Sequence, residues 1–314
     1  MFASRWLDFL VLIAIAVVLF GTLGPLFRGL RASGLSAAAA TARRRAIAAS
    51  AATGVAAIGA IALTLALTGS GYFAFVVATG PALTGAAMIA VATVAERTWP
   101  RPSGQVRSAA LRTRRAGSGS IAMSRMAIVG GVASVMLLIF AALTDEPGGV
   151  GAQLTWDSGK ATAGPYPGSH YTWAVLGALA LVCGLTLLGL RVVDARPALG
   201  VGLELEDEAA REASRVRILR GSAFAMLITT AGLLMSVVLS WAKVLESAQM
   251  DAPQAFDTVG WRLVQPLGVF AYVLGAAVAI LAIKVFLTPG PPMPTADQTP
   301  VSPAAVTPSR GAAA

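Results

Sequence analysis

Seven long apolar stretches alternate with polar segments along the 314 residues of the chain. A helix needs about 20 residues to cross the hydrocarbon core of a bilayer, which is about 30 Å thick. The first six stretches contain no Asp, Glu, Lys or Arg, and the seventh contains only Lys284, close enough to its end to reach the headgroups. The pattern predicts an all-α integral membrane protein, a seven-helix bundle within residues 1–287. The predicted spans are 9–27, 46–68, 72–95, 126–144, 172–190, 221–241 and 263–287.

Arginine and lysine are concentrated in alternate connections between these stretches. One set of connections holds 20 of them and the other holds four, which are Arg5, Lys160, Lys243 and Arg262. Cytoplasmic loops carry the excess of basic residues in membrane proteins. The split predicts that the N-terminus lies outside and the C-terminus in the cytoplasm. A cleaved signal peptide is the alternative for residues 1–20, but no convincing A-x-A site follows, so the segment is expected to remain.

The composition agrees with a membrane protein. Hydrophobic residues make up 56% of the chain, charged residues only 12%, and the mean hydropathy is +0.73. The abundance of Ala and of Arg over Lys is typical of a GC-rich bacterial genome, so we expect a multi-pass protein of the bacterial cytoplasmic membrane. A net charge of +9 would suggest a nucleic-acid partner in a soluble protein. Here topology accounts for it, and the expected partners of the arginine-rich loops, such as residues 105–115, are anionic lipids.

A weak internal repeat is visible at a spacing of ninety residues. The segments Ser124–Ile128 and Ser214–Ile218 resemble each other and enter the fourth and sixth spans. One interpretation is a lone first helix followed by three tandem hairpins, since parallel repeats occur in transporters. The alternative is chance matching among Ala, Val, Leu and Gly.

Residues 288–314 include seven prolines and almost no charge. Such a segment cannot bury enough apolar surface to fold, so it is predicted to be a disordered, Pro-rich cytoplasmic tail.

Reactive residues are scarce. His170 is the only histidine and Cys183 the only cysteine, and the spans contain no acid. These counts argue against coupled ion transport, intramembrane aspartyl or zinc proteolysis and bis-His haem binding. Lys284 lacks an acidic counter-ion in any span, which argues against a rhodopsin. We therefore predict no catalytic residue, no cofactor site and no metal site, and expect Cys183 to be a small buried apolar residue.

The outer segment 145–171 contains Asp157, Ser158, Ser169 and His170, the residue types of a catalytic triad. No G-x-S-x-G turn accompanies them. His170 is expected to be an interfacial residue, and the run from Gly164 to Gly168 is expected to form turns.

Residues 204–220 carry acids at their start and arginines toward their end, which suits a helix dipole. Asp207 with Arg211, and Glu212 with Arg215, are spaced to pair across a turn. We predict a helix that runs into the sixth span. It could dock a protein partner, or it could be a solvated extension.

The second span is rich in Ala, Gly and Ser, which favours close helix packing and a place at the centre of the bundle. Gly59 belongs to this set. In the third span, Gly80 and Pro81 are expected to kink the helix.

The missing chemistry favours a protein that is not an enzyme: an accessory, scaffold or regulatory membrane subunit. The alternative is a permease for a neutral or apolar small molecule, which needs no charge in the bilayer. A membrane enzyme is the third possibility. A polar cavity between the spans would favour the permease, and a solid interior with a docking face would favour the subunit.

Overall fold

A computed structural model describes residues 37–67, 73–99, 117–149, 151–156, 159–164, 166–197, 204–251 and 258–288. The predicted span at 9–27, the basic segment 105–115 and the predicted tail beyond Thr288 lie outside these residues.

Six helices in the described part of the chain are long and apolar enough to cross a membrane. Each overlaps one predicted span. The described protein is mostly helical, and its helices are compatible with a multi-pass membrane protein. The largest difference is in α6, whose 48 residues extend well beyond the predicted 221–241 on both sides. The helices are α2 (Ala37–Leu67), α3 (Phe73–Arg97), α4 (Ser118–Leu143), α5 (Ser169–Ala195), α6 (Glu204–Asp251) and α7 (Thr258–Leu287).

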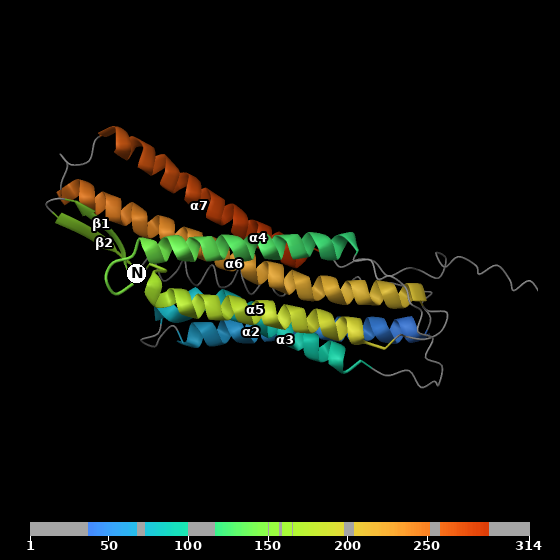
Figure 1. Ribbon diagram of the computed structural model, residues 1–314. Coiled ribbons are helices and arrows are strands. Elements are labelled where there is room, and N and C mark those ends of the chain that lie inside the picture. The colour runs from blue at the N-terminus through green and yellow to red at the C-terminus, as the bar shows by residue number, and fades with distance from the viewer. Residues whose placement is uncertain are drawn as a thin grey trace, which may run out of the picture.

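Successive helices alternate in direction along the bundle (Figure 1). The starts of α2, α4 and α6 therefore gather at one end with the ends of α3, α5 and α7. We call it the basic end, because Arg45, Arg97, Arg196 and Arg211 lie there. Arg45 on α2 donates a hydrogen bond to the carbonyl oxygen of Thr98, just after α3, at 2.7 Å.

Helix α6 is the centre of the bundle. It contacts α3, α4, α5, α7 and both strands of a small hairpin. Small residues permit these close approaches. A Cβ atom added to Gly85 of α3 would collide with Ala225 of α6, and one added to Gly130 of α4 would lie 3.1 Å from the backbone at Met226 and Leu227.

The prediction that the second span forms the centre is wrong. Helix α2 packs mainly on α3, and a Cβ atom added to Gly59 would meet nothing within 4 Å. The buried positions of α2 include Ala49, Thr53 and Ala57, which are four residues apart and form one stripe. The small residues of α2 lie on all sides of the helix, so its composition alone could not indicate which side is buried.

The middle helices are paired across the chain. Helix α4 lies along α6 and α5 lies along α3, each pair running in the same direction (Figure 1). The hydroxyl groups of Ser134 on α4 and Thr230 on α6 are hydrogen-bonded at 2.9 Å. Contact between α4 and α5 is smaller. Helices α4 and α5 therefore do not pack as a self-contained hairpin, in contrast to the interpretation as three tandem hairpins. Helix α3 runs through Pro81 from Phe73 to Arg97.

A two-stranded antiparallel hairpin, for which the sequence analysis made no prediction, covers the opposite end of the bundle (Figure 1). Its strands are β1 (Ala152–Trp156) and β2 (Gly159–Ala163). The hairpin packs on α6 through Ala152 and Ala161. Nearby, the Tyr166 hydroxyl bonds the hydroxyl of Thr144 at 2.6 Å and accepts a hydrogen bond from Trp241 Nε1 at 3.2 Å.

The outer surfaces of the helices are apolar as well as the inner ones. On α4, Ile128, Val129, Val132, Met136 and Ile139 are exposed, opposite the buried face that packs on α6. A helix that is apolar on all sides suits a membrane, where lipid covers the outer face. Cys183 is exposed on α5. The prediction that it is buried is wrong, because an apolar residue in a span can face lipid instead of protein.

Candidate functional site

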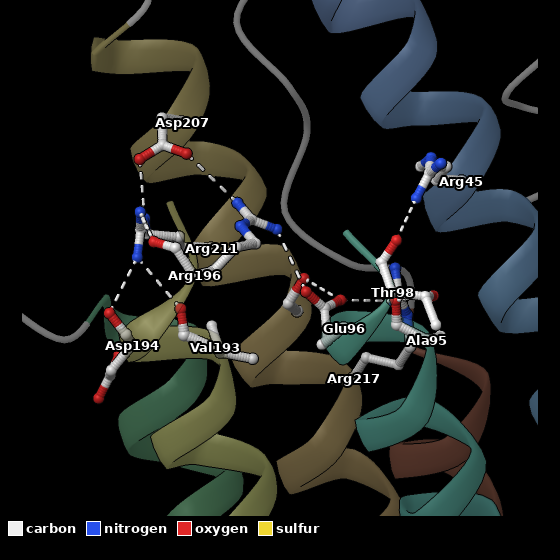
Figure 2. Close-up of polar contacts among 11 residues, drawn as sticks. Arg45, Ala95, Glu96, Thr98, Val193, Asp194, Arg196, Asp207, Arg211 and Arg217 are labelled. Carbon is white, nitrogen blue, oxygen red and sulfur yellow. Dashed lines mark hydrogen bonds and ion pairs between the residues drawn. The ribbon is translucent and has the colours of Figure 1, made fainter. Parts of the chain in front are cut away.

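Glu96, in the last turn of α3, is a buried carboxylate with three partners (Figure 2). Its side chain is 2% exposed. Oε2 accepts a hydrogen bond from Arg196 Nη1 at 3.2 Å, and Oε1 accepts hydrogen bonds from Ser214 Oγ at 2.6 Å and Arg217 Nη1 at 3.4 Å. A buried charge needs such pairing to offset the loss of hydration. Glu96 thereby joins α3 to α6 and to the residue after α5.

Arg196, which follows α5, is fully buried between two acids. Its Nη2 lies 3.4 Å from Asp207 Oδ1, and its guanidinium carbon lies 4.0 Å from the centre of the Trp99 ring. Burial lowers the pKa of Arg196 below its ordinary value, while the charges of Glu96 and Asp207 act in the opposite direction. The guanidinium thus connects the carboxylates of α3 and α6.

Arg211 of α6 caps the end of α5. Its Nε donates to Asp207 Oδ2 at 2.7 Å. Its other nitrogens donate to the carbonyl oxygens of Val193 and Asp194, both at 3.1 Å, and of Arg196, at 2.6 Å. The last carbonyl groups of a helix have no partner within it and carry partial negative charge. A cation at this position satisfies them.

Glu212 of α6 caps the start of α4. Its carboxylate accepts hydrogen bonds from the backbone N–H groups of Gly117 at 3.3 Å and Ser120 at 3.1 Å. Arg215 lies 2.6 Å from Asp194 Oδ1 and 3.9 Å from Glu212. The first third of α6 thus carries a separate side chain for the ends of α3, α4 and α5.

The sequence-based expectations for residues 204–220 are partly confirmed. The segment is helical and Asp207 pairs with Arg211. Glu212 and Arg215 are close, but each has a shorter contact elsewhere. The solvated extension is wrong, because Asp207, Arg211 and Ser214 are buried against the neighbouring ends.

Three residues of this network were not singled out from the sequence: Glu96, Asp194 and Arg196. All three lie within a few residues of the end of an apolar stretch. Arg196 contributed only to the count of basic residues, and the two acids were given no role. The available signal was that Glu96 and Asp194 are isolated acids at the ends of the third and fifth stretches, in segments otherwise rich in arginine.

These contacts join the ends of α3, α4 and α5 to the first third of α6. Ser214 donates a hydrogen bond to a carboxylate that also accepts hydrogen bonds from two arginines, so the lone pairs of Glu96 are already engaged. Among the described residues, no group of three or more His, Cys, Asp and Glu could hold a metal ion.

Other residues considered from the sequence lie elsewhere. Asp157 and Ser158 fall outside the described residues. Ser169 and His170 are exposed at the start of α5, where the Ser169 N–H donates to Asp145 Oδ2 at 2.6 Å and the His170 ring meets Tyr171 edge-on at 4.9 Å. Lys284 is exposed near the end of α7.

Comparison with protein-family models, with curated proteins and with solved structures gives no match, so the fold and this network are interpreted from the residues of the chain itself.

Proposed function

We propose that the protein is a non-enzymatic accessory, scaffold or regulatory subunit that works with another protein in a bacterial cytoplasmic membrane. The observation that carries the proposal is at the basic end. There α6 extends past its apolar part and is held to the neighbouring helices by ion pairs. A helix of 48 residues is about 72 Å long, more than twice the thickness of the hydrocarbon core. The outward side of this segment, held in place by its ion pairs, offers a surface for a partner without requiring chemistry.

The proposal includes a topology. Residues 9–27 form a seventh span, the N-terminus lies outside, and the basic end and the tail at 288–314 lie in the cytoplasm. The distribution of Arg and Lys supports this orientation.

The interior of the described bundle supports a packed subunit. Four buried threonines each donate to the carbonyl oxygen four residues earlier in their own helix: Thr53, Thr79, Thr93 and Thr186. Their hydroxyl groups are therefore satisfied locally. Buried apolar side chains such as Ile89, Leu138, Val182 and Ile218 fill the space between the helices.

The partner surface is proposed to be the outward face of residues 204–220. Asp207 and Glu212 point inward and hold α5 and α4, whereas Glu208 is exposed. A test that removes every acid of the segment would therefore mix loss of a partner with loss of the fold. Glu208 alone reports on the partner.

Site-specific photocrosslinking in living cells tests this proposal. A benzophenone amino acid at position 208 should give a discrete adduct with another protein. The same probe in place of Arg191, an exposed residue of α5 at the same end, is the matched control. Absence of an adduct at 208, or the same adducts at both positions, would contradict the proposed surface.

A permease for a neutral or apolar small molecule is the second candidate, and one observation favours it. A groove of about 960 Å³ lies between α6 and α7 and is lined mainly by apolar residues, including Val238, Trp241, Leu267 and Tyr272. Passage of neutral apolar tracers into proteoliposomes containing the purified protein, faster than into protein-free vesicles, would support the permease over the subunit.

A further inference from the structure

Arg220 differs from the other arginines of α6 at the basic end. Arg211, Arg215 and Arg217 each contact a carboxylate. Arg220 is half-buried, and its Nε atom is buried without a hydrogen-bond partner. Within the described part of the chain, no ion pair or hydrogen bond engages its guanidinium group. A partly buried guanidinium group without a counter-ion is unfavourable, so the position favours the binding of an anion.

The surroundings of Arg220 follow from the next turn of α6. Phe224, four residues later, lies 5.1 Å from the ring of Phe286 on α7 and packs in a cluster with Ala57 of α2 and Met88 of α3. Residues four apart share a face of a helix, and side chains tilt toward its N-terminus. Arg220 therefore projects toward the junction of α2, α3 and α7, one turn nearer the basic end.

Arg217 lies on the same side of α6, with its side chain 14% exposed. Its contact with Glu96 is 3.4 Å long, and Glu96 is shared with Arg196 and Ser214 (Figure 2). Arg45 of α2 contributes a third cation near the end of α3, at Thr98. The junction thus holds more positive charge than its one carboxylate balances.

The chain has few other acids to offer here. Residues 28–36 and 100–116 contain seven arginines and no acid, and the only acid after Lys284 is Asp297. The sequence of the first two segments thus offers further arginines and no carboxylate. A counter-ion for Arg220 is more readily supplied from outside the chain.

We infer that Arg220, together with Arg217, binds a phosphate group, either that of an anionic lipid or that of a soluble phosphate. Guanidinium groups bind phosphate through paired hydrogen bonds. Arg220 stands where the apolar part of α6 begins, the level at which lipid phosphates lie in a bilayer. The site is independent of the proposed partner surface, because Glu208 is exposed elsewhere on α6.

Thermal unfolding of the full chain in a neutral detergent tests the inference. Phosphatidylglycerol should raise the midpoint by about 2–4 °C relative to phosphatidylcholine, as expected for a roughly tenfold shift of the folding equilibrium. The same rise is expected for Arg191→Gln, which changes an exposed arginine at the same end. The rise in the unfolding midpoint should be absent in Arg220→Gln. An equal rise in Arg220→Gln would overturn the site.

A second pair of titrations identifies the source of the phosphate. A rise with inorganic phosphate over chloride at equal ionic strength, again lost in Arg220→Gln, would support a soluble ligand. A rise with phosphatidylglycerol alone would support a lipid, and no rise with either would overturn the inference. If Arg220→Gln does not fold, Arg220→Met keeps the side-chain volume without the charge, and the same outcomes apply to it.

Discussion

Glu96 joins the ends of three helices through a single side chain. Its two oxygen atoms accept hydrogen bonds from Arg196, Ser214 and Arg217, and its side chain is almost inaccessible to solvent. Removing one partner from a buried ion pair leaves the other charge uncompensated in a region of low dielectric constant. Replacement of this one carboxylate should therefore loosen the ends of α3, α5 and α6 together.

We expect Glu96→Gln to destabilise the protein by about 3–5 kcal/mol, because two buried arginines lose their shared counter-charge. The matched control is Glu208→Gln, which removes an exposed carboxylate and should change stability by less than about 0.5 kcal/mol. Chemical or thermal unfolding in detergent measures both. Equal stability of the two variants would show that Glu96 does not fasten the helices.

The contacts of these charged residues were predictable only where they are local. Asp207 and Arg211 are four residues apart, and that spacing was enough to predict their ion pair. The partners of Glu96 lie 100, 118 and 121 residues further along the chain. No spacing rule connects residues so far apart, because the packing of α3 on α5 and α6 brings them together.

At the level of elements, the position of a small residue on its helix matters more than the number of small residues. Helix α2 has many, but only one stripe of it is buried. Helix α6 has fewer in its middle, yet Ala225 and the backbone at Met226 lie against glycines of two neighbouring helices. Close approach depends on a small residue at the point of contact with the neighbouring helix, which the composition of one helix cannot reveal.

Gly85→Ala should therefore destabilise the bundle by about 1–3 kcal/mol, because the new methyl group would collide with Ala225 and force α3 away from α6. Gly59→Ala adds the same atom in open space on α2 and should be neutral or slightly stabilising. Gly268→Ala on α7 also has open space and serves as a second control. Thermal unfolding in detergent compares the three. A larger loss for Gly59→Ala than for Gly85→Ala would contradict α6 as the centre.

For the whole molecule, hydropathy located the described helices well because a bilayer demands long apolar segments with satisfied backbones. It could not predict that α4 lies along α6 and α5 along α3. Apolar faces turned toward lipid and toward protein have similar compositions, since lipid tails are as apolar as leucine. The ion pairs at the basic end connect α3 and the end of α5 to α6. Charged residues therefore specify which helices are neighbours, which their hydrophobic surfaces do not.

Ser118 and Ser169 test the arrangement of the whole chain in the membrane. They are exposed at the starts of α4 and α5, at opposite ends of the bundle (Figure 1). Single cysteines at these positions, in a Cys183→Ala background that removes the native thiol, should react from opposite sides of intact cells. A membrane-impermeant maleimide should label position 169 from outside, and position 118 only after the membrane is opened, because arginine-rich segments stay in the cytoplasm. Labelling of position 118 but not 169 in intact cells would reverse the orientation, and equal labelling of both would contradict the alternation of spans.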